Sequence, residues 1–446
     1  METSKKNLIV IGGGAAGIFC AVNAARRDPG LRVCVLEKTG KLLSKVRVSG
    51  GGRCNVTHAC FDIGEMAKRY PRGGHFVRKA FHRWFTTDTI EWFRERGVEL
   101  KIEADGRMFP VTDDSETIIG CLIRELNAYG VEIRLHAEVR GVEGGSAAGR
   151  PDGVEGTASG DMVEAGEMGD VAGGGIEARA GAGFRVRLAS GQVLDADYVC
   201  VACGGYPKST QFDWIRQLGH SIEDPVPSLF TFNTPGDPIT KLMGVSVGEA
   251  QVKIAGSKLA EKGPLLITHW GLSGPVVLRL SAWGARELAA GDYRFAVQVN
   301  WLPGLTEREV RGKLQQERYD RAGQLISSRN PLNLPQRLWE HWLEVAGIGN
   351  GVRWADLPAR QQNKLVSLLC AGAFSITGKT TFKEEFVTAG GVKLAEVDPA
   401  SMQSRKVPGL FFAGEILDVD GITGGFNFQH AWTSGWIAAD TIAGGG

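Results

Sequence analysis

Four residues near the start of the chain have the types and the spacing that bind a dinucleotide. Gly12, Gly14 and Gly17 form a GxGxxG pattern, and Glu37 follows the last of them by 20 residues. In such a pattern the first glycine permits a tight turn, the second lets the backbone approach a pyrophosphate, and the third lets a helix pack closely on a strand. The carboxylate can accept hydrogen bonds from a ribose. These residues predict a dinucleotide site and leave the identity of the dinucleotide open.

The residues around the glycines supply the strand, turn and helix that the pattern needs. Apolar residues 8–11 and 32–36 indicate two strands, and residues 15–27 indicate a helix between them. The first N–H groups of that helix, at Ala15 and Ala16, can bind an anion because the helix dipole is positive at this end. The alternative is a glycine-rich turn in an ordinary α/β domain.

Length, charge and hydropathy set the broad class of the protein. The chain has 446 residues, of which 43% are hydrophobic, and a formal net charge of +1. A chain of this length is too long to fold around one simple hydrophobic core, so we expect two or three domains. The balanced charge favours a small-molecule substrate over nucleic acid, although a local patch of positive charge could be present in a chain with almost no net charge. Because no apolar stretch reaches about 18 residues, we expect a cytoplasmic protein without a membrane partner; the oligomeric state stays open.

The eight cysteines do not indicate a disulfide framework or a metal site. Most stand in apolar strand or helix sequences, such as Cys20, Cys34 and Cys121, so reduced thiols are expected. Cys200 and Cys203 have CxxC spacing, but they lie in a strand-like run without the helix start that would lower a thiol pKa. We therefore do not favour a redox dithiol there, and no metal is predicted.

A second glycine-rich stretch, residues 38–58, suits a loop over the cofactor. Its predicted cofactor ligands offer backbone N–H groups, positive charge or a polar side chain: Lys38, Lys45, Ser49, Gly50, Gly51, Gly52, Arg53 and Asn55. Cys54, Asn55 and His58 at its end are the candidate catalytic residues, although each could only pack or hold a turn. The alternative is a solvated basic loop.

The run SGGGRCNVT at residues 49–57, after the GxGxxG pattern, resembles the HI0933-like or YhiN-like family of predicted NAD(P)/FAD-dependent oxidoreductases. The resemblance covers nearly the whole chain and extends to residues 106–110, 268–275, 388–392 and 409–435. It implies FAD as the cofactor and an α/β fold class. The implied architecture is a Rossmann-like FAD-binding domain with an inserted β-barrel-like domain that carries a small helical domain. This sequence departs from the family at His58 and His430, where members often have asparagine and tryptophan.

The same resemblance adds residues to the predicted FAD site. A strand over 131–139 would pass beside the adenine, and residues 202–206 are similar to a run that ends a strand against the cofactor. Glu415 stands where related flavoproteins place an acid on ribityl or ribose hydroxyls. A helix over 426–439 could stabilise negative charge on a reduced flavin, although an ordinary strand–loop–helix closure is the alternative. The added residues are Val139, Ala202, Gly204, Gly414, Glu415, Gly424, Gly425, Phe426 and Asn427.

The order of the expected elements predicts a discontinuous first domain with two insertions. We expect residues 1–206 and 385–446 to form the FAD-binding domain, residues 207–303 and 372–384 the barrel-like domain, and residues 304–371 a bundle of three short helices. The helices are expected over 306–319, 334–345 and 358–370. Residues 141–183 are dominated by glycine, alanine and acidic side chains, so this low-complexity stretch cannot offset the entropy of ordering itself.

The favoured function is an FAD-dependent oxidoreductase that acts on an unidentified small molecule. Hydride or electron transfer is the flavin's own chemistry, so the protein has to position the substrate and control oxygen access. Only one dinucleotide fingerprint is present, so NAD(P)H would be a transient reductant without a Rossmann domain of its own. We expect the substrate near Tyr206 and residues 270–275. The alternatives are an NAD-dependent dehydrogenase and a non-catalytic, nucleic-acid-associated flavin-binding regulator.

Deleting residues 141–183 should leave the flavin content of the purified protein unchanged, because a stretch with so few aromatic or long aliphatic side chains adds little to a packed site. The ratio of flavin absorbance to protein absorbance measures this. A soluble deletion variant that purifies as apoprotein would contradict the prediction.

Overall fold

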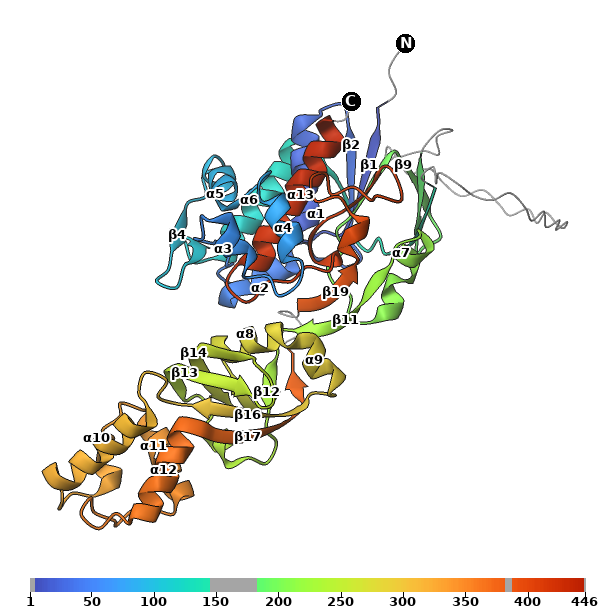
Figure 1. Cartoon of the computed structure of the whole chain (residues 1–446). Coiled ribbons are helices and arrows are strands. Elements are labelled where there is room, and N and C mark those ends of the chain that lie inside the picture. The colour runs from blue at the N-terminus through green and yellow to red at the C-terminus, as the bar shows by residue number, and fades with distance from the viewer. Residues whose placement is uncertain (1–4, 145–182, 382–386, 445–446) are drawn as a thin grey trace, which may run out of the picture.

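The computed structural model describes residues 5–144, 183–381 and 387–444. Most of the low-complexity stretch predicted over residues 141–183 lies outside these residues. Three parts follow one another in a row (Figure 1): a Rossmann-like part that contains the first and last described elements, a barrel-like part, and a bundle of helices at the far end.

A parallel sheet of five strands forms the centre of the Rossmann-like part. Its order is β20–β10–β1–β2–β6. The bounds are β1 (Asn7–Ile11), β2 (Arg32–Leu36), β6 (Glu132–Arg134), β10 (Tyr198–Val201) and β20 (Leu410–Phe412). Every residue of β1 is buried, as expected for a strand that is covered on both faces. The strand expected over 131–139 is wrong in extent, because β6 ends at Arg134 and Val139 begins a different sheet.

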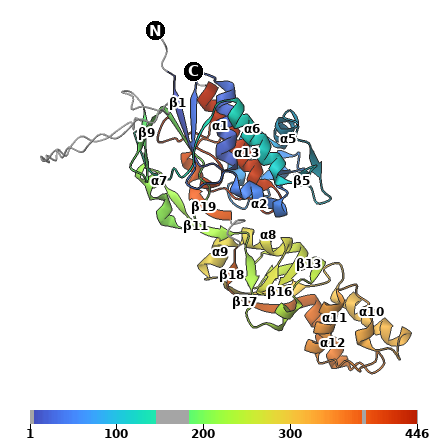
Figure 2. The same ribbon diagram turned by 180° about the vertical axis from the view of Figure 1, so that it is seen from behind.

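Three long helices cover one face of this sheet (Figures 1 and 2): α1 (Ala15–Arg27), α6 (Ser115–Ala128) and α13 (Phe426–Gly444). α1 and α13 come from opposite ends of the chain. They touch where a Cβ on Gly435 would lie 2.5 Å from the Ala16 carbonyl oxygen. Only glycine allows this approach, so the packing places the middle of α13 beside the start of α1.

Shorter elements surround the long helices. They are α2 (Ser44–Gly52), β3 (Thr57–His58), α3 (Ile63–Ala67), α4 (Gly74–Ala80), α5 (Thr86–Arg94), β4 (Leu100–Ile102) and β5 (Arg107–Pro110). The aromatic side chains around α5 are core residues: Phe81, Trp84, Phe85, Trp92 and Phe93 are all buried. Their spacing of three and four residues already indicated this face. Among the described residues, no helix has the length and apolar character to cross a membrane.

The other face of the central sheet carries a small antiparallel sheet, β7 (Val139–Gly144), β8 (Phe184–Leu188) and β9 (Val193–Ala196), next to α7 (Asp213–Gln217). Gly144 pairs with Phe184, so β7 and β8 form a hairpin. β9 and β10 do not pair with each other, because β9 pairs with β8 whereas β10 pairs with β1. The chain passes from one sheet to the other between them.

The barrel-like part is a seven-stranded antiparallel sheet in the order β17–β16–β13–β14–β15–β12–β18. Its strands are β12 (Thr231–Asn233), β13 (Ser246–Ile254), β14 (Ala260–Thr268), β15 (Gly271–Ser273), β16 (Arg294–Asn300), β17 (Gly372–Thr377) and β18 (Lys379–Thr380). Residues of β17 alternate between buried and exposed, as expected when one face packs and the other meets water. Helices α8 (Pro275–Trp283) and α9 (Ala285–Ala290) lie on the side of the Rossmann-like part.

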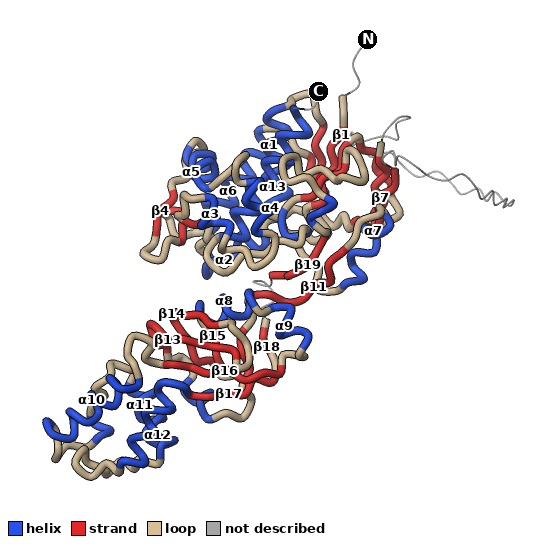
Figure 3. Tube along the Cα trace, in the orientation of Figure 1, coloured by secondary structure: helices blue, strands red, loops and turns tan. Residues whose placement is uncertain are grey.

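The helical bundle contains α10 (Glu307–Asp320), α11 (Gln336–Ala346) and α12 (Ala359–Ala371). These bounds agree within two residues with the helices expected from periodicity. Figure 3 shows the three helices beyond the strands of the barrel-like part. The Trp342 ring of α11 packs 5.8 Å from the Trp301 ring and 6.2 Å from the Phe374 ring. The bundle and the barrel-like part therefore share one hydrophobic core.

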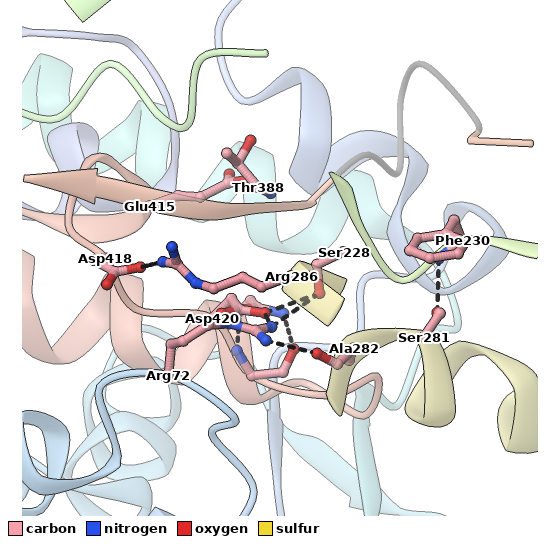
Figure 4. A network of polar contacts seen from close by, with 12 residues as sticks. Arg72, Ser228, Phe230, Ser281, Ala282, Arg286, Thr388, Glu415, Asp418 and Asp420 are labelled. Carbon is pink, nitrogen blue, oxygen red and sulfur yellow. Dashed lines mark hydrogen bonds and ion pairs between the residues drawn. The ribbon is translucent and has the colours of Figure 1, made fainter. Parts of the chain in front are cut away.

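Two strands join the barrel-like part to the Rossmann-like part, and so do the hydrogen bonds of a buried ion pair that lies within the Rossmann-like part. Strand β11 (Ile222–Ser228) pairs antiparallel with β19 (Val387–Val392). Figure 4 shows the Arg72 guanidinium against the Asp420 carboxylate, which is fully buried. Ser228 donates a hydrogen bond to Asp420 at 2.8 Å, and Arg72 donates to the Ala282 carbonyl at 2.7 Å. Burial raises the pKa of Asp420, while the bonds from Arg72 and Ser228 act in the opposite direction.

Replacing Arg72 by methionine should lower the free energy of unfolding by about 3 to 5 kcal/mol, because it leaves the Asp420 carboxylate buried without a cation. Chemical denaturation followed by tryptophan fluorescence measures the loss. The double variant Arg72→Met with Asp420→Leu is the matched control and should recover much of it, since an apolar pair of similar volume replaces the ions. A single variant as stable as the wild type would refute the prediction.

Candidate functional site

The three glycines of the turn between β1 and α1 differ in the space around them. A Cβ on Gly12, where φ is +115°, would lie 2.4 Å from the Ala202 carbonyl oxygen, and a Cβ on Gly17 would lie 2.0 Å from that of Gly12. A Cβ on Gly14 would meet no atom within 4 Å. Gly12 and Gly17 are therefore needed for packing inside the protein, whereas Gly14 borders open space at the start of α1.

The start of α1 is prepared for an anion. Its first turn contains no acidic residue, and the residue at its N-cap, Gly14, has no side chain that could bond the free N–H groups. These N–H groups, which include those of Ala15 and Ala16, carry the positive end of the helix dipole. A pyrophosphate fits this end of the helix.

Glu37 lies at the carboxyl end of β2, where the predicted ribose contact requires it. One carboxylate oxygen accepts a hydrogen bond from the Gly13 N–H at 2.9 Å, and the other accepts from the N–H and the hydroxyl of Thr39 at 2.8 Å each. These bonds fix the direction of the carboxylate. Because an ionised carboxylate has about four acceptor positions, it can still accept bonds from a ribose.

A cavity of about 270 Å³ opens beside Glu37. Its lining joins the central sheet to β7 and α7: Ile11, Gly12, Leu36, Glu37, Lys38, Ala137, Glu138, Val139, Arg140, Cys203, Tyr206, Thr210, Gln211, Asp213, Trp214 and Gln217. Val139 stands here, where the adenine is expected. Tyr206, expected beside the substrate, lines this cavity instead, and the Lys38 ammonium lies 5.8 Å from the centre of its ring.

The second glycine-rich stretch is not a loop throughout. A short helical segment within it begins at Ser44. This segment ends at Ser49, where the backbone ψ of 146° is not helical. Gly50, Gly51 and Gly52 then have φ values of +61°, +71° and +87°, a left-handed run that only glycine adopts readily. A Cβ on Gly50 would lie 2.7 Å from the Phe109 ring, but Gly51 and Gly52 border open space.

Arg53 and Cys54 are both engaged by the protein. The Arg53 guanidinium pairs with the Glu103 carboxylate at 2.6 Å and lies 3.9 Å from the centre of the Phe109 ring. Its charge is thus balanced, and its contact with the cofactor stays a prediction. Cys54 is completely buried, and this burial raises the pKa of its thiol to about 12. A protonated thiol without access to solvent is a poor nucleophile, which argues against a catalytic role.

Asn55 and His58 bind the glycine turn before α13. With its amide oriented to satisfy both neighbours, Asn55 donates to the Thr57 carbonyl at 3.1 Å and accepts from the Gly425 N–H at 3.0 Å. The His58 ring stacks on Phe426 with centroids 4.7 Å apart. His58 Nδ1 lies 3.1 Å from the Gly424 carbonyl oxygen, which can only accept, so Nδ1 carries the proton.

The start of α13 therefore lies against residues 55–58, as the predicted flavin site requires. A Cβ on Gly425, where φ is +91°, would lie 2.5 Å from the Thr57 carbonyl oxygen. Asn427 faces its own turn, because its amide donates to the Gly421 carbonyl at 2.9 Å and accepts from the Gly421 N–H at 2.8 Å. Its predicted role as a cofactor ligand would need further bonds from the same amide.

Glu415 connects three distant segments. One of its carboxylate oxygens pairs with the Lys45 ammonium at 2.6 Å, and the other accepts from the Thr388 N–H at 2.9 Å. Gly204 is close by, since a Cβ there would lie 3.9 Å from Glu415. The Gly414 N–H donates to the Ser434 hydroxyl of α13 at 2.8 Å. The predicted ligands from the first, middle and last parts of the chain thus meet around one carboxylate.

Two polar residues at this place were not predicted as site residues. Among the buried atoms without a hydrogen-bond partner in the described residues are Thr388 Oγ1 and His430 Nδ1. His430 Nε2 lies 3.3 Å from the Gly414 carbonyl oxygen, and burial lowers the pKa of His430 to about 4. Thr388 stood in a run that carries the family resemblance, which was the one signal available. His430 had been noted only as a departure from the family, and the packing of α13 is what brings it to Gly414.

These residues fit FAD. The open space beside Gly14, Gly51 and Gly52 leaves room where a Cβ would obstruct a ligand. The free N–H groups of α1 would hold the pyrophosphate, Glu37 the ribose, and the cavity beside Val139 the adenine. The buried Thr388 hydroxyl, without a partner, can bond a polar group of the ligand.

Comparison with protein families agrees with this geometry. Residues 6–153 match the model described as the HI0933-like protein Rossmann domain, and residues 226–387 match that of the HI0933-like protein barrel and H2TH domain. The two matches together cover more than half of the chain. The chain belongs to the HI0933-like family. The predicted family and α/β fold class are confirmed, and with them FAD as the cofactor and an FAD-dependent oxidoreductase as the enzyme class.

Relatives align over almost the full chain. A 3-dehydro-bile acid delta(4,6)-reductase of Clostridium scindens is 29% identical over 97% of this chain and 98% of its own. A ribosomal RNA dihydrouridine synthase of Escherichia coli is 29% identical over 97% of both chains, and one of Haemophilus influenzae is 29% identical over 98% of both. Among solved structures, the 3-ketosteroid-delta4-(5alpha)-dehydrogenase of Rhodococcus jostii RHA1 aligns over 98% of both chains, with 12% identity and a TM-score of 0.48.

Replacing Gly14 by valine should abolish FAD retention and leave the protein folded. The backbone there is extended, with φ −89° and ψ −172°, and the new side chain would enter the open space of the pyrophosphate site. The ratio of flavin to protein absorbance and the circular dichroism spectrum measure the two effects.

The matched control is Gly120→Val on α6, where a Cβ would stand 3.6 Å from its nearest neighbour, so this variant should keep its flavin. Gly17→Val should fail to fold, because its Cβ would overlap the Gly12 carbonyl. Full FAD occupancy in Gly14→Val would exclude this position for the pyrophosphate.

Proposed function

We propose that this HI0933-like protein is a reductase that saturates a carbon–carbon double bond conjugated to a carbonyl group. The observation that carries the proposal is the chemistry shared by its two kinds of full-length relative. A delta(4,6)-reductase of 3-dehydro-bile acids acts on double bonds in line with a 3-oxo group. A dihydrouridine synthase saturates the uracil double bond next to a ring carbonyl. The substrates differ greatly, but the bond type is the same.

FAD, when bound, supplies the hydride for such a reduction. The protein's contribution is electrostatic and steric. The N–H groups at the start of α13 and of the Gly51–Gly52 run stabilise negative charge that develops beside them. The buried link through Arg72 and Asp420 holds the barrel-like part against the same loop that carries Gly424 and Gly425. A substrate held between the two parts would therefore be screened from bulk water.

Saturation of the bond also requires a proton, and His58 is the predicted catalytic candidate with partial access to solvent. Burial lowers the pKa of His58, and the Gly424 carbonyl raises it to a smaller extent. A neutral imidazole whose Nδ1–H is bonded to Gly424 has no free proton on that atom. We therefore assign His58 a positioning role, in which it holds the turn from Gly424 to Phe426, and the proton that accompanies the hydride would come from a water molecule bound beside the substrate.

The reductant in this proposal is NAD(P)H, bound transiently. The described residues contain one parallel sheet with one glycine fingerprint, and FAD requires it. A nicotinamide would have to reach the flavin along the substrate path and leave before the substrate enters. Reduction and substrate turnover would then alternate at one site.

Anaerobic stopped-flow absorbance tests the proposal. The purified protein should lose its flavin absorbance on mixing with NADH or NADPH, and should regain it on mixing with a 3-oxo-Δ4 steroid or with uridine-containing RNA. Mass spectrometry should find two added hydrogens in the product. A saturated 3-oxo steroid is the matched control and should not reoxidise the flavin. Reoxidation by none of the unsaturated compounds, or flavin reduction by an amine instead, would overturn the proposal.

A further inference from the structure

α10 and α12 lie at the end of the molecule farthest from the Rossmann-like part (Figures 1 and 3). A groove lined by arginines lies between these two helices. Its volume is about 450 Å³. The lining consists of three arginines, three side-chain amides and two small residues, without a carboxylate: Arg308, Arg311, Gly312, Gln315, Arg318, Ala359, Gln362 and Asn363. The site assigned to FAD uses none of these residues.

The spacing on α10 places the arginines on one face. Residues 308, 311, 315 and 318 recur at three- and four-residue intervals, so their side chains follow one stripe along the helix. Tyr319 falls at the edge of this stripe, and 74% of its surface is exposed. From Arg308 to Arg318 the helix rises about 15 Å, so the stripe is long enough to contact more than one phosphate of a nucleic-acid strand.

The guanidinium groups have unused hydrogen-bonding capacity. Arg311 donates to the Glu307 carboxylate at 2.8 Å and to Asn363, and Arg318 donates to Gln362 at 3.5 Å. Among the described residues, Arg308 forms no hydrogen bond or ion pair. Each guanidinium has five donors, so most of them are available to phosphate oxygens.

Positive and negative charge are distributed unequally between the parts of the chain. Residues 226–381, which form the barrel-like part and the bundle, contain 18 lysines and arginines against 12 aspartates and glutamates, a net charge of +6. The complete chain has a net charge of +1, so the remaining residues sum to −5. A polyanion would therefore be attracted to this part of the molecule and repelled by the rest.

We infer that the groove between α10 and α12 binds the sugar–phosphate backbone of RNA. The inference rests on the proposed function, and it identifies RNA as the class of molecule that carries the reducible double bond. Arginines match phosphates, side-chain amides match ribose hydroxyls and base edges, and an exposed tyrosine can stack on an unpaired base. The groove and the flavin site lie at opposite ends, so a substrate that contacts both must be a macromolecule. A small unsaturated ketone could use only the flavin end.

Fluorescence anisotropy of a labelled RNA hairpin with a uridine-containing loop tests the inference on the holoenzyme. The double variant Arg308→Gln with Arg311→Gln should weaken binding about tenfold at low salt and flatten the dependence of affinity on salt, because two phosphate contacts are lost. The matched control is Lys313→Gln with Arg329→Gln, which removes the same charge from exposed positions outside the groove. It should change the affinity by less than about twofold.

Arg311 bonds its neighbours, so the single variant Arg308→Glu provides a second measurement that does not depend on those bonds. It should also weaken RNA binding, with an unchanged melting temperature. The inference is overturned if the wild type does not bind the hairpin, if both double variants lose affinity equally, or if Arg308→Glu binds like the wild type.

Flavin reoxidation by a 3-oxo-Δ4 steroid and by uridine-containing RNA, measured on the same preparations, distinguishes this inference from the proposed function. If the flavin is reoxidised but the groove variants bind RNA as well as the wild type, the inferred RNA site in the groove is rejected and the proposed reductase function stands. If the groove variants lose RNA binding but neither compound reoxidises the flavin, the proposed reductase function is rejected and the RNA site stands.

Discussion

The contact between the first and last long helices determines the rest of this structure. α1 and α13 approach so closely that a Cβ on Gly435 would lie 2.5 Å from the Ala16 carbonyl oxygen. This packing brings the middle of α13 to the turn between β1 and α1, where the pyrophosphate is predicted. Gly414 and Glu415 then reach the residues after β1, because the Ser434 hydroxyl of α13 accepts the Gly414 N–H. A site contributed by both ends of the chain thus depends on the small size of a few residues.

Local patterns were sufficient where one stretch determines its own structure. The three helices of the bundle follow from apolar residues at helical spacing, and the β1–α1–β2 unit follows from the glycine spacing. The predicted roles of Gly12, Gly14 and Gly17 agree with the space around each Cβ. Such features are predictable because the steric requirement lies within a few residues of the glycine itself.

Features that depend on residues far apart in the chain could not be predicted from local sequence patterns. Residues 193–196 and 198–201 have similar strand patterns, yet they join different sheets, because pairing is decided by neighbours elsewhere in the chain. Arg53 has the charge that suits a phosphate, but Glu103 and Phe109 engage it within the protein. Tyr206 was expected beside the substrate and lines the cavity by Val139 instead. Residue type indicates which bonds are possible, and packing decides which partner receives them.

The two insertions make different demands on a substrate. The barrel-like part and the bundle share one core, so the groove keeps a fixed position relative to the sheet beside the flavin site. The barrel-like part is joined to the Rossmann-like part by the two-stranded link and by the hydrogen bonds that Ala282 and Ser228 form with the ion pair of Arg72 and Asp420. The proposed reduction requires only an activated double bond at the near end. The proposed contact at the far end requires length and negative charge. A substrate that satisfies both must be long, anionic and locally unsaturated, and uridine-containing RNA combines these properties.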